Sequence, residues 1–214
     1  MQHQSKNLDD KAIISEIKKI KVTKPEVAGM IVHNPTDLPI ISNEEKRVIV
    51  GIDKTRCAVF FEEEEKAEKE FQALQMGARW GITPKVYGRK GTYVVMENLS
   101  APTVEEYLKK NKLTKEFTKR LLGLLTTFKK VGYTRLDQKL NCIYLMSNGS
   151  FKVVNLHRHN KLPEKLFPQR MIKGMGKQAE VFLQYVKELD STLYDSWTKH
   201  PKFKSTIEKA KLSK

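Results

Sequence analysis

The feature that most constrains the fold is the separation of strand-forming from helix-forming segments along the chain. The first half carries short apolar runs of strand character around one amphipathic helix that begins at four glutamates, Glu62 to Glu65. The second half carries long helical stripes around a single hairpin. The predicted strands are residues 48–50, 57–61, 85–87, 93–96, 142–145 and 151–154. This segregation predicts an α+β architecture.

Local signals predict where several elements begin and end. Four isoleucines at helical spacing predict a docking helix over residues 9–21. Thr103 and Glu106 have the spacing of a capping box, which predicts that a short helix starts there. Asn148-Gly149 lies between two apolar runs, and this pair is the strongest short hairpin signal.

The charge balance limits the kinds of partner that we consider. The 214 residues carry a formal net charge of +15, and lysines concentrate in the tail 199–214, which we expect to be solvated. An acidic protein partner suits such a surface. Nucleic acid is the less favoured alternative, because the sequence lacks the interleaved aromatic and basic residues of a stacking platform. No apolar run is long enough for a transmembrane segment, and only two cysteines occur, so we expect a cytoplasmic protein without disulfides.

One segment carries a family resemblance. Residues 93–108, YVVMENLSAPTVEEYL, resemble the hinge that joins the two lobes of protein kinases. The resemblance implies that Met96 is the gatekeeper and that the backbone of Glu97-Asn98-Leu99 binds the adenine edge of ATP. Small bacterial serine/threonine-kinase-like proteins with a reduced small lobe are the class that it most resembles.

Other segments resemble kinase elements in the same order. Residues 70–74, EFQAL, resemble the αC helix, whose glutamate (here Glu70) pairs with a strand lysine. Residues 135–145, RLDQKLNCIYL, resemble the catalytic loop, and residues 152–155, KVVN, resemble the strand that carries the magnesium-binding aspartate. Together these segments imply a bilobal fold with a reduced β-rich N-lobe and a mainly helical, truncated C-lobe. The implied parts are an N-terminal helix and linker (1–34), the N-lobe (35–98), the C-lobe (99–198) and the basic tail (199–214).

The spacing of the family motifs gives a preferred register. In the family the catalytic base lies five residues before the metal asparagine and about 18 before the metal aspartate. With Asp137 as base, Cys142 then takes the asparagine position and Asn155 the aspartate position. A rival register takes Asn141 as the metal asparagine, which puts Leu136 at the base and is chemically worse.

Several groups that phosphoryl transfer requires are replaced. Phe60 is assigned to the position of the phosphate-binding lysine, and Lys54 or Lys66 would have to reach in from elsewhere. No G-x-G-x-x-G loop occurs. Cys142 offers a soft sulfur that suits Mg²⁺ poorly. Asn155, with Asn141 as a second weak candidate for the metal, offers a neutral carbonyl in place of a carboxylate.

The leading interpretation is a degenerate kinase-like protein, a pseudokinase or regulatory scaffold with weak or absent ATP binding. One alternative is an active atypical phosphotransferase that uses ATP and Mg²⁺ with Asp137 as base. Another alternative is a basic nucleic-acid-binding module. Ordinary structural roles also stay open: Glu70 suits a helix rim, Asp137 suits a turn before a strand, and Cys142 suits a small buried hydrophobe.

Overall fold

The computed structural model describes residues 10–23, 30–44 and 47–212, which divide into two compact units. The sheet unit comprises Met1–Gln75 and Pro84–Leu99. The helical unit comprises Met76–Thr83 and Ser100–Lys214. The predicted α+β composition is confirmed, with strands concentrated in one unit and helices in the other.

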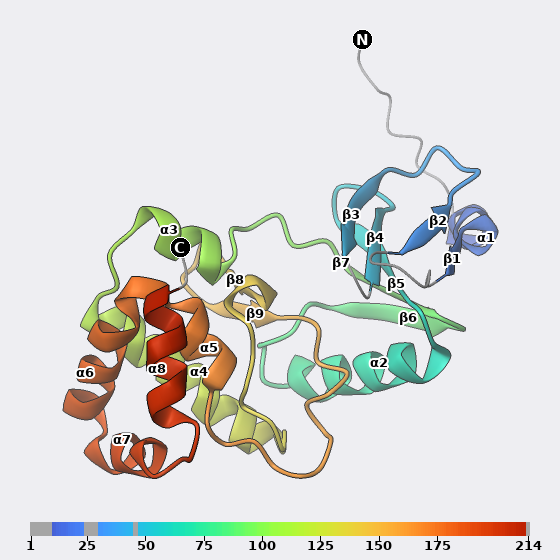
Figure 1. The fold of residues 1–214 in the computed structure, drawn as a ribbon. Helices are drawn as coiled ribbons and strands as arrows, with labels where there is room; N and C mark the ends of the chain where they lie inside the picture. Colours follow the sequence, from blue (N-terminus) through green and yellow to red (C-terminus); the bar gives the residue numbers. More distant parts are fainter. Residues whose placement is uncertain (1–9, 24–29, 45–46, 213–214) are drawn as a thin grey trace. The chain divides into compact units, whose positions relative to one another are not determined.

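The sheet unit is built on one antiparallel five-stranded sheet (Figure 1). Its strands follow the order β3-β4-β5-β7-β6, and β1 and β2 form a separate two-stranded pair. The elements are α1 (Asp10–Lys19), β1 (Lys21–Thr23), β2 (Ile31–His33), β3 (Ile40–Glu44), β4 (Arg47–Gly51), β5 (Arg56–Phe61), α2 (Glu64–Ala78), β6 (Val86–Lys90) and β7 (Tyr93–Glu97). The last residues of α2 belong to the helical unit.

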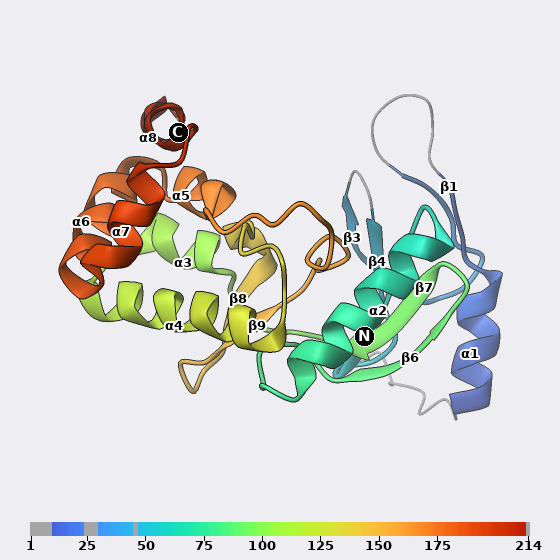
Figure 2. The same ribbon diagram turned by 90° about the horizontal axis from the view of Figure 1, so that it is seen from below.

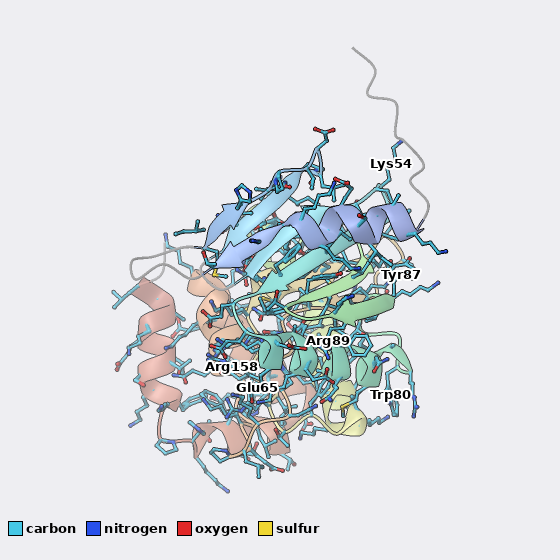
Figure 3. The ribbon with its side chains drawn as sticks, turned by 90° about the vertical axis from the view of Figure 1, so that its right-hand side faces the viewer. Lys54, Glu65, Trp80, Tyr87, Arg89 and Arg158 are labelled. Carbon is cyan, nitrogen blue, oxygen red and sulfur yellow. The ribbon has the colours of Figure 1, made fainter. Side chains whose placement is uncertain are left out.

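The two faces of this sheet are covered by different helices. Figure 3 shows α1 on one side of the sheet and α2 on the other. The core on the α1 side joins buried isoleucines of α1 to alternate residues of the strands; these are Ile13, Ile17, Val48, Val50, Ala58, Phe60 and Tyr93. Since successive side chains of a strand point to opposite faces, the residues between them face α2.

The predicted docking helix is confirmed, with one difference. Ile13, Ile17 and Ile20 are buried, but Ile14 is 42% exposed. A helix that packs on a flat sheet buries only one stripe, and Ile14 lies one residue outside that stripe. The stretch after this helix, where the sequence analysis placed no strand, contains the β1–β2 pair.

The described part of the helical unit contains the end of α2, eight further helical segments and one hairpin. Its elements are α3 (Val104–Lys110), α4 (Lys115–Val131), η1 (Leu140–Cys142), β8 (Ile143–Leu145), β9 (Phe151–Val153), α5 (Gln169–Gly174), η2 (Gly176–Gln178), α6 (Ala179–Leu189), α7 (Ser191–Thr198) and α8 (Phe203–Leu212). Figure 2 shows α4 beneath α6 and α7. None of the helices in the described part of the chain is long and apolar enough to cross a membrane.

Local sequence signals in this unit are confirmed. The Thr103 hydroxyl and the Glu106 carboxylate form the predicted capping box of α3. The predicted hairpin joins β8 and β9, and Gly149 adopts the left-handed φ of +82° that its turn requires. These features depend on neighbours in sequence, which explains why the sequence alone predicts them.

The prediction of a solvated basic tail is wrong over α8. Thr206 and Ala210 are fully buried, and α8 packs against α5. Lysines cover the exposed side of this helix. Because they dominate the composition of the segment, the sequence did not reveal that small residues pack on the other side. The final residues 213–214 lie outside the described part of the chain.

Candidate functional site

The helix that resembles αC is held to the sheet by charged groups. Arg89 of β6 forms ion pairs with Glu64 (3.0 Å) and Glu68 (2.6 Å) of α2. Glu70 follows Glu68 by two residues and is only 2% exposed, on the same side of the helix as the buried Ala67 and Leu74. The interpretation of Glu70 as a rim residue is therefore wrong. Its role as an ion-pair partner stays a prediction.

The strand that should carry the phosphate-binding lysine is apolar on both faces. Phe60 belongs to the α1 core, where its ring lies 5.3 Å from that of Tyr93. The residues of β5 on the α2 face are Cys57, Val59 and Phe61, all buried. Val59 rather than Phe60 thus faces the αC-like helix, and neither residue can bind phosphate.

The two lysines that would have to substitute for the missing phosphate-binding lysine either pair with glutamates or point away from the sheet. Lys66 forms ion pairs with Glu62 and Glu63 at the start of α2. Lys54 lies in the β4–β5 turn and points away from the sheet (Figure 3). The family resemblance places the phosphate-covering loop at residues 42–47 or 51–55, and residues 45–46 lie outside the described residues.

A buried cation that the sequence analysis missed lies on β4. Arg47 is only 4% exposed and stands opposite Phe61 in the sheet, on the α2 face. Its guanidinium donates two hydrogen bonds of 2.8 Å to the Glu44 carboxylate. A short segment rich in Glu, Lys and Arg resembles an exposed turn, and only the sheet register shows that this arginine points inward.

The hinge-like residues end strand β7. Met96 is buried on the α2 face, directly opposite Cys57. Burial raises the pKa of the Cys57 thiol to about 12, so this thiol stays protonated and unreactive. The backbone N–H of Glu97 donates to Lys85 O, and that of Asn98 donates to Thr55 O, both at 2.8 Å. These bonds hold the end of the strand, and Leu99 follows as the last residue of the sheet unit.

Three predicted metal-site residues lie together in the helical unit. The Asn155 side-chain amide donates to Cys142 Sγ at 3.6 Å, and the Cys142 thiol lies 3.3 Å from Asn141 Oδ1. Asn155 also has a left-handed backbone, with φ of +65°. An asparagine adopts this conformation more readily than most residues, and such strained positions concentrate at functional sites. The cluster combines amides and a thiol, a donor set that suits Mg²⁺ poorly.

Asp137 supports the loop before this cluster. Its carboxylate is 8% exposed, accepts the Arg170 backbone N–H at 2.5 Å and lies 3.5 Å from the Arg170 guanidinium. Arg170 lies in the first turn of α5, so Asp137 satisfies a helix N–H from outside that helix. Burial raises the pKa of the Asp137 carboxyl above its ordinary value, although the bonds from Arg170 oppose this effect. Its carboxylate therefore already has structural partners.

The neighbouring Gln138, which the sequence analysis did not single out, joins this loop to the strand end. Its side-chain amide donates to Val154 O at 2.9 Å, and the residue is 2% exposed. The bond fixes the backbone immediately before Asn155. A glutamine in a polar loop carries no pattern that would reveal such a buried bridge.

Replacing Asp137 by alanine should reduce the free energy of unfolding by about 1–2 kcal/mol, because a helix N–H and a neighbouring guanidinium lose their acceptor. Asp137→Asn keeps an acceptor oxygen and should cost less. Urea unfolding followed by circular dichroism measures both effects. Asp195→Ala, at an exposed position of α7, is the control. Equal stability of Asp137→Ala and the unmodified protein would contradict the structural role.

The fold defines the class to which this chain is similar: a kinase-like α+β protein. A solved structure, the co-crystal of WbdD with the kinase inhibitor LY294002, matches with a TM-score of 0.50 and 13% sequence identity. The match covers 86% of this chain but only 47% of the WbdD chain, so this chain spans about half of that protein. No protein-family model matches the sequence, and no curated protein does either. The structural match supports a kinase-like fold and carries no information about activity.

Proposed function

We propose that this protein is a kinase-like regulatory or scaffold module with weak or absent ATP binding. The observation that carries the proposal is the side-chain cluster of Asn141, Cys142 and Asn155. At the two positions where the family resemblance requires oxygen ligands for Mg²⁺, a thiol and a neutral amide contact each other. Both cysteines are buried and neither forms a disulfide, which suits the cytoplasmic setting that we propose for it.

The sheet unit, considered by itself, supports the same conclusion. The β5 positions nearest to the family's lysine are Val59 and Phe60, both buried and apolar. Phosphoryl transfer depends mainly on charge neutralisation and positioning. Loss of a single charge-stabilising donor at an active site costs about 2.7–4 kcal/mol of barrier, so an enzyme with these replacements should turn over very slowly.

Thermal unfolding with and without nucleotide tests the proposal. We expect Mg²⁺-ATP at millimolar concentration to change the melting temperature no more than ATP with EDTA does. A ligand present at its own dissociation constant adds only about 0.4 kcal/mol, which corresponds to about 1–2 °C for a chain of this size. A magnesium-dependent increase of several degrees would contradict the proposal.

A variant that restores the expected metal ligands makes this test more specific. Cys142→Asn combined with Asn155→Asp returns the oxygen ligands that the family resemblance implies. If the altered ligands alone limit nucleotide binding, this double variant should gain a magnesium-dependent increase in melting temperature. Cys57→Ser, a thiol replacement in the sheet unit, is the matched control and should gain none.

The second candidate function is an atypical phosphotransferase with Asp137 as base. The left-handed backbone of Asn155 favours it, because strain at this position suggests a functional constraint. ATP turnover that disappears in Asp137→Asn, while the folded state persists by circular dichroism, would establish this function and refute the scaffold.

A further inference from the structure

The helical unit contains a groove that shares only Asn141 with the predicted nucleotide site. Its volume is about 690 Å³, within the range of ligand-binding pockets. Three segments form its walls: α3, the loop around η1, and the run from α5 to η2. Gln178 connects two of these walls, since its side-chain amide donates to Leu108 O at 3.0 Å and to Asn111 O at 3.2 Å.

Cations dominate the groove. Five basic side chains line it from all three walls, against one carboxylate, Glu105; they are Lys109, Lys139, Arg170, Lys173 and Lys177. Arg170 is shared with Asp137, and Lys109 lies 3.8 Å from Glu105. In the part of the chain that the structure describes, Lys139, Lys173 and Lys177 form no ion pair. Positive charge that converges on a concave surface from separate elements attracts an anionic partner.

The floor of the groove is aliphatic. Leu108, Leu140 and Met175 line it and are each at most 8% exposed. Gly174 packs so closely on Leu140 that an added Cβ would lie 3.1 Å from its side chain. No aromatic residue is among the described residues that line the groove. Proteins that bind single-stranded nucleic acid combine a basic groove with aromatic rings on which the bases stack, so a lining without aromatic residues suits it less well.

We propose that this groove binds an acidic polypeptide segment that carries an aliphatic side chain among its carboxylates. The basic walls pair with the carboxylates, and the floor of Leu108, Leu140 and Met175 receives the aliphatic group. This inference names a partner class for the scaffold proposed above and rests on that function. It also identifies where part of the net charge of +15, which the sequence showed only as a total, gathers on the molecule.

Fluorescence anisotropy with a labelled peptide tests the proposal on the full chain. The probe is a peptide of roughly eight glutamates with one central leucine, long enough to span about 27 Å when extended. We expect saturable binding that weakens as the salt concentration rises from about 50 to 200 mM. The same peptide with serine in place of leucine should bind several-fold more weakly. Equal binding of the two peptides would refute a role for the apolar floor.

A pair of charge reversals locates the binding surface. Lys139→Glu with Lys173→Glu should raise the dissociation constant at least about tenfold, which corresponds to 1.4 kcal/mol. The control, Lys119→Glu with Lys204→Glu, changes exposed lysines outside the groove. Each pair lowers the formal net charge from +15 to +11, because each reversal removes two charges. Equal weakening by both pairs would refute the groove and indicate attraction by net charge alone.

Two further measurements keep the test decisive. If the glutamate variant fails to fold by circular dichroism, Lys139→Gln with Lys173→Gln removes the same two cations without adding repulsion. A single-stranded oligonucleotide of uridines is the competitor, and displacement of the peptide at lower concentration would overturn the proposal in favour of nucleic acid. If the peptide does not bind and ATP does not change the melting temperature, the peptide-binding proposal for the groove is refuted and the scaffold proposal is not. A magnesium-dependent ATP response would instead refute the scaffold.

Discussion

Phe60→Lys should lower the free energy of unfolding by more than about 3 kcal/mol, although this substitution places a lysine at the position that the family resemblance implies. Phe60 is 2% exposed and packs in the α1 core against Tyr93. Removing a buried phenylalanine side chain costs about 3–5 kcal/mol. The ammonium group adds a desolvation cost, because the buried neighbours of Phe60 in that core are apolar.

Urea unfolding of Phe60→Lys and Phe60→Leu, compared with the unmodified protein, measures the effect. Phe60→Leu keeps an apolar side chain in the same core and should cost much less than the lysine variant. A Phe60→Lys protein with nearly unchanged stability would contradict the assignment of Phe60 to the α1 face. It would also restore Phe60 as the family's lysine position.

Acidification should destabilise the protein through His159. This side chain is 3% exposed, and its ring lies 5.5 Å from the rings of both Phe128 and Tyr133. Neither ring nitrogen has a hydrogen-bond partner among the described residues. Burial lowers the pKa of His159 to about 3, and the positive charge of Arg170 acts in the same direction.

The sign of the effect follows from the lowered pKa. The folded protein keeps His159 neutral, while the unfolded chain protonates near pH 6.5. The full stability is therefore present above pH 6.5, and acidification below that pH removes about 1.4 kcal/mol per pH unit toward pH 3. Between pH 6.5 and pH 5 the loss should reach about 2 kcal/mol.

Chemical denaturation at pH 7 and at pH 5.5 measures this dependence. His159→Phe preserves the ring contacts and should remove that part of the loss. His33→Gln, at an exposed position of β2, is the control and should leave the dependence unchanged. Identical pH profiles of His159→Phe and the unmodified protein would show that other groups cause the loss.

Much of the architecture could be predicted from the sequence, because it depends on short-range chemistry. The helix from Lys115 to Val131 begins at a Thr114 cap and ends at Gly132, which adopts the left-handed conformation. The hairpin around Asn148-Gly149 forms where its turn residues predict it. In each case the decisive contacts join residues a few positions apart, so the local sequence pattern is enough to predict the element.

The candidate site could be predicted only in part. The preferred register places Cys142 and Asn155 near each other, and the 3.6 Å contact between their side chains agrees with that proximity. Whether Asp137 acts as a base stays a prediction. In the structure its carboxylate accepts a hydrogen bond from the backbone N–H of Arg170 in a helix. The sequence did not reveal this contact, because Arg170 lies 33 residues further along the chain.

The sequence by itself determined most of the strands and helices in order, together with the caps and turns, and its resemblance to kinases gave the expectation that the lysine, glycine loop and metal carboxylate are replaced. Only the tertiary structure decided which side chains face which neighbours. It placed Phe60 on the α1 face, buried Arg47 on the opposite face, and gathered cations from three separate segments around one groove. The physical reason is that strand register and helix packing bring together residues distant in sequence, and no local pattern specifies those contacts.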